Sequence, residues 1–253
     1  MREELLRAVE TVARLTGDVA QRHFNTVLRV ETKGDGSPVT IADREAEQAA
    51  RTWIAEHFPE DGIVGEEFGT LEGTSGRRWL LDPIDGTKSF IRGVPLWGAL
   101  VAVVEEEDVL AGAAWFPAVN EMIAAAAGKG CWWNGARASV SDTSTLAGAT
   151  VLVTDERAFR TSALRDDWRT LTGEASLART WGDCYGYLLV ATGRAEVMVD
   201  PVVNAWDIAC FVPIIEEAGG VLTDLAGRRT AFGGTAIATN AALAERAREF
   251  FDA

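Results

Sequence analysis

The chain has 253 residues, 47% of them apolar and 25% charged, which suits one large domain or two closely joined lobes. Its formal charge of −14 argues against binding to nucleic acid or to an anionic membrane surface. It has two histidines and neither an H-E-x-x-H nor a G-x-S-x-G motif, which argues against a histidine-rich zinc site and a serine hydrolase.

The first half of the chain predicts two helices followed by mostly antiparallel strands. Apolar spacing predicts helices over residues 3–24 and Asp43–His57, the second ended by Pro59. A hairpin is expected within Gly130–Val140, around the Asn134-Gly135 turn. The expected strands are Gly62–Glu66, Arg78–Asp82, Leu96–Val104, Val109–Phe116 and Glu121–Ala126. We therefore expect an N-terminal α+β lobe over residues 1–145.

The second half alternates between strands and helices, which predicts a C-terminal α/β lobe over residues 146–253. The expected strands are Thr150–Val153, Glu196–Val199, Val221–Thr223 and Ala236–Ala238. The expected helices are Arg157–Leu171, Tyr185–Ala191, Trp206–Ala218 and, after an N-cap at Asn240, residues 241–252. The two lobes should form one compact structural unit.

The most informative segment is the loop Asp82-Pro83-Ile84-Asp85-Gly86-Thr87. An apolar strand delivers Asp82 at its end, Pro83 should stop that strand, and Asp85 follows three residues after Asp82. Two carboxylates on so short a loop repel each other unless a cation lies between them. Magnesium, which prefers oxygen ligands, fits this arrangement, with the Ile84 carbonyl as a further oxygen. The segment therefore predicts a magnesium site.

Three weaker acidic signals accompany this loop. Gly65-Glu66-Glu67 follows a short strand, although paired glutamates are common on helices. Asp43 stands at a strand-to-helix junction, where the ordinary role of an aspartate is an N-cap. Asp207 follows Trp206 in the first turn of an apolar helix, where an acidic side chain complements the helix dipole. Each of them alone is compatible with an ordinary structural role.

Taken together, these segments resemble the inositol monophosphatase superfamily. Its marks are a V-T-x-A-D-like segment, G-E-E, D-P-[IL]-D-G-T and a late W-D, and all occur here in order across residues 39–210. The resemblance implies a layered αβαβα sandwich of the sugar-phosphatase type and magnesium-dependent hydrolysis of a small phosphorylated metabolite by a homodimer. Two departures, Ser89 where the family usually has asparagine and Cys210 where alanine or glycine is commoner, should affect packing.

The resemblance also implies roles for individual residues, with two or three Mg²⁺ ions per site and an activated water as the nucleophile. The implied metal ligands are Glu66, Asp82, Asp85, Asp207 and the Ile84 carbonyl, with Glu67 as a possible further ligand of metal or water. The implied catalytic residues are Asp43, Glu66 and Thr87, of which Asp43 and Thr87 would orient the water. Gly86 and Thr87 would offer backbone N–H groups to the phosphate.

The substrate should be chosen by residues beyond the metal ligands. Asp183 lies among Trp181, Tyr185 and Tyr187, which suits a cationic or aromatic ligand, although its ordinary role is a helix cap. Asp200 precedes Asp207 by seven residues, where the family carries an acidic residue that contacts the non-phosphate end of the substrate.

The stretch 179–196 resembles the histidinol-phosphate phosphatase branch of this superfamily. The branch implies conversion of histidinol phosphate and water to histidinol and phosphate, a step of histidine biosynthesis, with the substrate amine paired to Asp183 and Asp200. Asp85 and Asp207 would adjoin the same substrate. Inositol 1-phosphate, or another sugar or nucleotide monophosphate, stays open as the substrate.

Readings from other classes stay open as well. An inactive binding or regulatory protein would be expected to lack a metal carboxylate, and none is missing from the motifs. Cys131 and Arg137 fit the C-x5-R pattern of cysteine phosphatases, but the interval reads as a hairpin. Three well-separated cysteines, an N-terminus unlike a secretory signal and the absence of a long apolar run predict a cytoplasmic protein.

Overall fold

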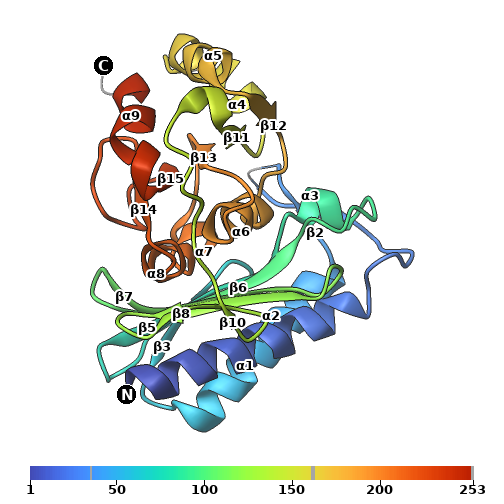
Figure 1. The fold of residues 1–253 in the computed structure, drawn as a ribbon. Coiled ribbons are helices and arrows are strands. Elements are labelled where there is room, and N and C mark those ends of the chain that lie inside the picture. The colour runs from blue at the N-terminus through green and yellow to red at the C-terminus, as the bar shows by residue number, and fades with distance from the viewer. Residues whose placement is uncertain (35, 161–162, 252–253) are drawn as a thin grey trace.

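In the computed structural model, residues 1–34, 36–160 and 163–251 are described. Two helices, α1 (Arg2–Gln21) and α2 (Ile41–His57), cover one face of a large sheet (Figure 1). A short hairpin, β1 (Glu31–Thr32) and β2 (Pro38–Val39), precedes α2. Because α1 turns one apolar stripe toward the sheet, its buried residues recur at helical spacing.

The first sheet has eight strands in the order β10-β9-β8-β7-β6-β5-β3-β4. Neighbouring strands are antiparallel except β3 and β5, which are parallel. This agrees with the mostly antiparallel pairing expected for the first half. The strands are β3 (Gly62–Gly65), β4 (Gly69–Leu71), β5 (Arg77–Asp85), β6 (Gly98–Glu105), β7 (Asp108–Phe116), β8 (Glu121–Ala126), β9 (Gly130–Trp133) and β10 (Ala136–Arg137).

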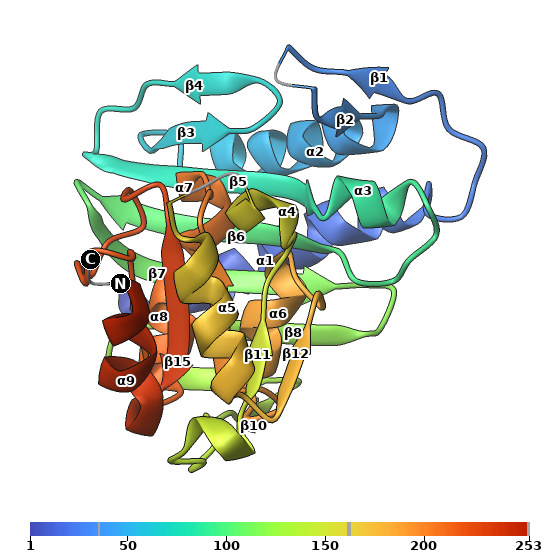
Figure 2. The same ribbon diagram turned by 90° about the horizontal axis from the view of Figure 1, so that it is seen from above.

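The second sheet has five strands in the order β12-β11-β13-β15-β14. They are β11 (Thr150–Leu152), β12 (Leu177–Arg179), β13 (Val197–Asp200), β14 (Gly220–Thr223) and β15 (Ala236–Asn240). Helices α6 (Cys184–Ala191) and α8 (Phe211–Glu217) lie between the sheets. The outer face carries α5 (Arg165–Glu174) and α9 (Ala244–Arg248), as Figures 1 and 2 show. The molecule is therefore the layered αβαβα sandwich that the sequence predicted.

The packing of β5 and β6 explains why an acidic side chain reaches the middle layer. In β6, Leu100 and Ala102 pack with the helices between the sheets, while Val101 and Val103 pack under α1 and α2. Strand β5 alternates in the same way, with Leu80 facing the middle layer. Since side chains two residues apart share a face, Asp82 follows Leu80 toward the middle layer.

Three expected helices are divided in the structure. Residues 157–171 form α4 (Arg157–Arg160) and the start of α5, and residues 161–162 lie outside the described part. Residues 206–218 form α7 (Ala205–Ile208) and α8. Proline at position 213 cannot donate to the Ala209 carbonyl, which favours a new helix start just before it. The closing segment forms the 3₁₀ turns η2 (Ala241–Leu243) and η3 (Glu249–Phe251) around α9, and residue 252 of the expected helix lies outside the described residues.

Strand β2 agrees with the strand-to-helix junction expected at Asp43, and helix α3 (Thr87–Phe90) begins directly after Gly86. Other short elements were not expected from the sequence: β1, β4, β12 and the 3₁₀ turn η1 (Leu146–Gly148). They are too short to carry a periodic signal. Over the described residues, no helix combines the length and the apolar character that crossing a bilayer requires.

Candidate active site

Strand β5 brings Asp82 and Asp85 to the same side through a bulge. The expectation that Pro83 ends the strand is wrong, because β5 continues to Asp85. Asp82 pairs with Leu100 and Asp85 pairs with Gly98, so β5 has one residue more than β6 over this interval. In a regular strand, side chains three residues apart point to opposite faces. The extra residue of the bulge shifts this alternation, so that Asp82 and Asp85 point to the same face. Proline is tolerated at this position because a residue within a bulge need not donate a backbone hydrogen bond to the neighbouring strand.

Asp207 joins the two β5 carboxylates from the short helix α7. Its Oδ2 accepts hydrogen bonds from the backbone N–H of Asn204 at 2.8 Å and from the Asn204 side-chain amide at 3.2 Å. The chain around α7 packs closely on the first sheet, since a Cβ on Gly112 of β7 would lie 2.4 Å from the Cys210 carbonyl oxygen. Cys210, one of the two departures from the family pattern, is therefore a packing residue.

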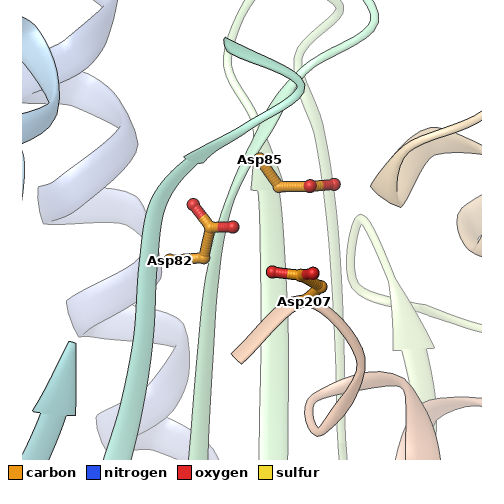
Figure 3. Close-up of side chains that lie close together, drawn as sticks. All are labelled: Asp82, Asp85 and Asp207. Atoms are coloured by element: carbon orange, nitrogen blue, oxygen red, sulfur yellow. The ribbon is translucent and has the colours of Figure 1, made fainter. Parts of the chain in front are cut away.

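The three carboxylates of Asp82, Asp85 and Asp207 form one cluster, with one oxygen from each within 4.8 Å of the others. Figure 3 shows them gathered where the end of β5 meets α7. Burial, and then repulsion among neighbouring carboxylates, raises the pKa values of Asp82 and Asp85 well above the ordinary range. Burial also raises the pKa of Asp207 to about 6. A hard divalent cation with oxygen ligands is the group that this set of donors fits.

Each of these carboxylates is held by a backbone N–H group on one oxygen. Ile84 N–H donates to Asp82 Oδ1 at 3.0 Å, and Cys184 N–H donates to Asp85 Oδ2. Asn204 holds Oδ2 of Asp207 in the same way. The carboxylates are thus oriented by the fold before any cation binds.

Glu66 and Glu67 follow β3 and face a lysine that the sequence reasoning missed. Lys33 Nζ lies 2.6 Å from Glu66 Oε1 and 2.6 Å from Glu67 Oε1. Burial raises the pKa of Glu67 to about 7. The glutamate charges help to raise the pKa of Lys33. Lys33 lies far from both glutamates in the chain, so nothing in the sequence pattern marked this contact.

The buried side chain of Glu47, from α2, shapes this glutamate turn. Its carboxylate accepts hydrogen bonds from the backbone N–H groups of Glu67 at 2.8 Å and Phe68 at 3.2 Å. A Cβ on Gly65 would lie only 2.0 Å from Glu47 Oε1. Position 65 therefore requires glycine, because the Glu47 carboxylate lies too close to its backbone for any side chain. This explains the glycine of the G-E-E motif.

Asp43 and Thr87, the expected water-orienting pair, each have another partner. Asp43 is not the N-cap of α2, because Thr40 takes that position and Asp43 completes a capping box. Asp43 Oδ2 accepts from the backbone N–H and the hydroxyl of Thr40, both at 2.8 Å. Thr87 donates its hydroxyl to the Ile84 carbonyl at 2.9 Å. No hydrogen bond of the described residues joins Asp43 to Thr87 directly.

Gly86 provides the turn between the carboxylates of β5 and helix α3. It is the N-cap of α3 and has a φ of 85°, which a residue with a Cβ rarely adopts. A Cβ at this position would also meet the Leu96 carbonyl oxygen at 3.0 Å. Glycine here lets the chain turn directly from Asp85 into α3.

A cavity of about 120 Å³ joins Asp85 and Asp207 of the carboxylate cluster to the two expected substrate residues. Asp183 is the N-cap residue of α6, but its side chain makes no capping hydrogen bond. Burial raises its pKa to about 6. Asp200 ends β13 and accepts hydrogen bonds from the Tyr187 hydroxyl at 2.9 Å and from Thr154 N–H at 3.1 Å. The cavity is lined by Asp85, Thr154, Asp183, Cys184, Tyr187, Asp200, Val202, Val203 and Asp207.

Cys131 does not have the character of a nucleophile. It is buried in β9, and burial raises the pKa of its thiol to about 12. A cysteine phosphatase needs the opposite, a thiol with a lowered pKa. The hairpin of β9 and β10 around Asn134-Gly135 agrees with the prediction from the sequence.

Comparison with known proteins gives consistent results. A family model described as the inositol monophosphatase family matches residues 1–251. A histidinol-phosphatase of Chlorobaculum parvum is 42% identical over 232 residues, which cover 92% of this chain and 88% of that protein. A histidinol-phosphatase of Mycobacterium tuberculosis is 39% identical over 85% of both chains. The solved inositol monophosphatase of Zymomonas mobilis has a TM-score of 0.88 at 31% identity, covering 99% of this chain and 98% of that one.

Proposed function

Because this chain belongs to the inositol monophosphatase family, we propose that it is a magnesium-dependent phosphatase that hydrolyses histidinol phosphate to histidinol and inorganic phosphate. The observation that carries the choice of substrate is the cavity in which Asp183 and Asp200 adjoin the carboxylates of Asp85 and Asp207. The relatives named histidinol-phosphatase, at 42% and 39% identity, support the same choice.

We assign the magnesium ligands to Glu66, Asp82, Asp85, Asp207 and the Ile84 carbonyl, with Glu67 close by. The cluster of three carboxylates, one buried and two half-buried and all with raised pKa values, offers only oxygen donors, fits a hard divalent cation and is unfavourable without one. When bound, two or three Mg²⁺ ions would neutralise charge on the phosphoryl group and lower the pKa of the attacking water.

The remaining catalytic work falls to side chains of this protein. Asp43, whose carboxylate is fixed by Thr40, and Thr87, which lies beside the Ile84 carbonyl, orient the attacking water. Glu66 accepts its proton. Backbone N–H groups of Gly86 and Thr87 bind the phosphate at the start of α3. Water attacks phosphorus, the ester bond breaks, and the alcohol leaves with a proton.

The alcohol end of the substrate explains why two further carboxylates share the cavity. Histidinol carries an ammonium group, and a buried site built to bind an amine rejects analogues that lack it. Asp183, partly exposed and without a capping bond, is placed to accept from that ammonium. Asp200 contributes a second negative charge.

Inositol 1-phosphate is the alternative substrate, because the solved inositol monophosphatase of Zymomonas mobilis shares this fold over nearly its whole length. Another sugar or nucleotide monophosphate would use the same carboxylates as hydrogen-bond acceptors. An inactive binding protein is disfavoured, because every carboxylate that the family motifs require is present in this chain.

The cellular setting belongs to the same proposal. We propose a role in histidine biosynthesis, a homodimeric assembly and a cytoplasmic location. The three cysteines of the described chain are buried and free, which suits a reducing compartment. The dimer rests on family membership alone.

Phosphate release from histidinol phosphate and from inositol 1-phosphate, measured side by side with magnesium and with EDTA, tests the proposal. We expect a clear preference for histidinol phosphate and no release in EDTA. Equal rates would keep the metal mechanism but reject histidinol phosphate as the substrate. Release that persists in EDTA would reject the metal mechanism.

A further inference from the structure

Thr154 connects the two carboxylate residues of the substrate cavity. It follows β11 and lines the cavity. Its backbone N–H donates to Asp200 Oδ1 at 3.1 Å, and its hydroxyl oxygen accepts from the backbone N–H of Asp183 at 2.8 Å. One residue in the segment that follows β11 therefore contacts both the end of β13 and the N-terminus of α6.

Asp183 is held in a backbone conformation that it would not adopt freely. Its φ is 49° and its ψ is −155°, a region that strongly favours glycine. The turn around it is packed tightly on Thr154, since a Cβ on Gly182 would lie 2.1 Å from Thr154 Cα. Thr154 holds the N–H of Asp183, and Asp85 holds the next N–H, that of Cys184. Strain of this kind persists only where the surrounding structure fixes it.

Asp200 is fixed from both sides as well. One of its oxygens accepts from Thr154 N–H and the other from the Tyr187 hydroxyl. Tyr187 is itself buried and stacks on Phe211, with ring centroids 5.0 Å apart. Asp200 therefore cannot turn away from Asp183 to relieve their mutual repulsion.

We propose that Thr154 is a positioning residue that holds Asp183 in its strained turn beside Asp200, and so sets selectivity for an alcohol that carries a positive charge. Two carboxylates kept together in one small cavity favour a cationic ligand over a neutral polyol. This inference rests on the proposed function, because it names the cation as the group that the cavity selects.

The test compares Thr154→Val with the wild-type enzyme on histidinol phosphate and on inositol 1-phosphate, with magnesium. Valine keeps the shape and the backbone N–H to Asp200, but it removes the hydroxyl that accepts from Asp183 N–H and that also interacts with the Asp200 carboxylate. We expect KM for histidinol phosphate to rise about tenfold with kcat little changed, while kcat/KM for inositol 1-phosphate stays within about twofold. Thr154→Ser keeps the hydroxyl and should retain the wild-type preference.

Thr150→Val is the matched control. Thr150 is the first residue of β11, and its backbone N–H donates a hydrogen bond to the Glu196 carboxylate. No hydrogen bond of its hydroxyl is found among the described residues. This variant should keep the wild-type preference. Thr154→Ala provides a second removal of the hydroxyl if the valine variant fails to fold, as judged by its thermal midpoint.

A double-mutant cycle with Asp183→Asn shows whether Thr154 acts through Asp183. We expect Thr154→Val to cause no further loss of preference once the Asp183 charge is gone. A Thr154→Val enzyme with the wild-type preference would overturn the inference and leave the proposed function intact. So would an equal loss on both substrates, or fully additive effects in the cycle. A wild-type enzyme without preference for the cationic substrate would overturn both.

Discussion

The carboxylates of the candidate site are held in fixed orientations by the backbone. Asp82, Asp85 and Asp207 each accept a backbone N–H on one oxygen, so the carboxylate orientation depends on neighbouring turns rather than on a bound ion. The same hydrogen bonds only partly offset burial and the repulsion among the carboxylates, which is why the pKa values of Asp82 and Asp85 stay raised. Single-residue changes here should therefore affect stability and activity in opposite directions.

Asp85→Asn tests this opposition. Asparagine can still accept from Cys184 N–H through its side-chain oxygen, but it carries no charge for a cation. We expect kcat/KM to fall by about a hundredfold or more with magnesium present. In EDTA the thermal midpoint should rise, because one buried charge is gone. Asp108→Asn, at a position with an 86% exposed side chain, is the control and should change neither quantity. Near-normal turnover in Asp85→Asn would contradict the metal assignment.

Gly65→Ala tests the close approach beneath the glutamate turn. The new Cβ would meet the Glu47 carboxylate, which cannot retreat because Glu67, Phe68 and Arg51 all donate to it. We expect destabilisation of about 1–3 kcal/mol, measured by urea unfolding, together with reduced activity through displacement of Glu66. Gly173→Ala on α5 meets no atom within 4 Å, so it should be neutral or slightly stabilising. Equal stability of the two variants would reject this account of Gly65.

Two irregular elements, rather than the regular ones, build the site. The bulge in β5 aims Asp82 and Asp85 at one point, and the β1–β2 hairpin carries Lys33 over the glutamate turn. A proline in a strand reads as a stop signal, whereas here it lies within the bulge of a continuing strand. The sequence therefore identified the residues of this loop but misjudged the element that holds them.

Lys33→Gln tests the role of the hairpin. Since Lys33 is paired with Glu66, which we propose as a magnesium ligand, the lysine and the proposed cation would compete for the same carboxylate. Removing the ammonium should lower, by about threefold or more, the magnesium concentration that gives half of the thermal shift. Lys129→Gln, which removes an exposed lysine near Glu3, should leave this concentration unchanged. A higher magnesium requirement in Lys33→Gln would show instead that the lysine supports the site.

At the scale of the whole molecule, the site lies where the two sheets and the middle helices meet. Asp82 and Asp85 come from the first sheet, Asp200 from the second, and Asp183 and Asp207 from the starts of middle-layer helices. All of these carboxylates are at least partly buried. Binding of a cation should therefore stabilise the fold, because its proposed ligands join the first sheet to the short helix α7 of the middle layer.

The pH dependence of stability without metal follows from the same burial. The pKa values of Asp183 and Asp207 are raised to about 6 in the folded protein, against 3.8 for an ordinary aspartate. Between these values the folded state binds more protons than the unfolded state, so stability decreases as pH rises. In EDTA we expect the thermal midpoint to fall from about pH 4 to about pH 6 on account of these groups.

Saturating magnesium at neutral pH should reverse this loss. Magnesium at about a hundred times its dissociation constant would add about 2.7 kcal/mol to the free energy of unfolding. In a chain of this size, that raises the thermal midpoint by about 5 °C or more. Scanning calorimetry with magnesium, with EDTA and with sodium at matched ionic strength checks both expectations. A thermal midpoint that does not change with magnesium would contradict the expectation that metal binding stabilises the folded protein.

The sequence by itself determined the family, the layered architecture and the residues of the short motifs, because these depend on local order: apolar periodicity, turn residues and the spacing of carboxylates. The family and the αβαβα fold are confirmed, while the roles of the site residues stay predictions. The structure brings Asp207 beside Asp82 and Asp85, as the resemblance implied. Only the tertiary structure decided that Lys33 faces Glu66 and that Thr154 and Tyr187 hold Asp200. These contacts join segments far apart in the chain, and they depend on how two sheets and the helices between them pack.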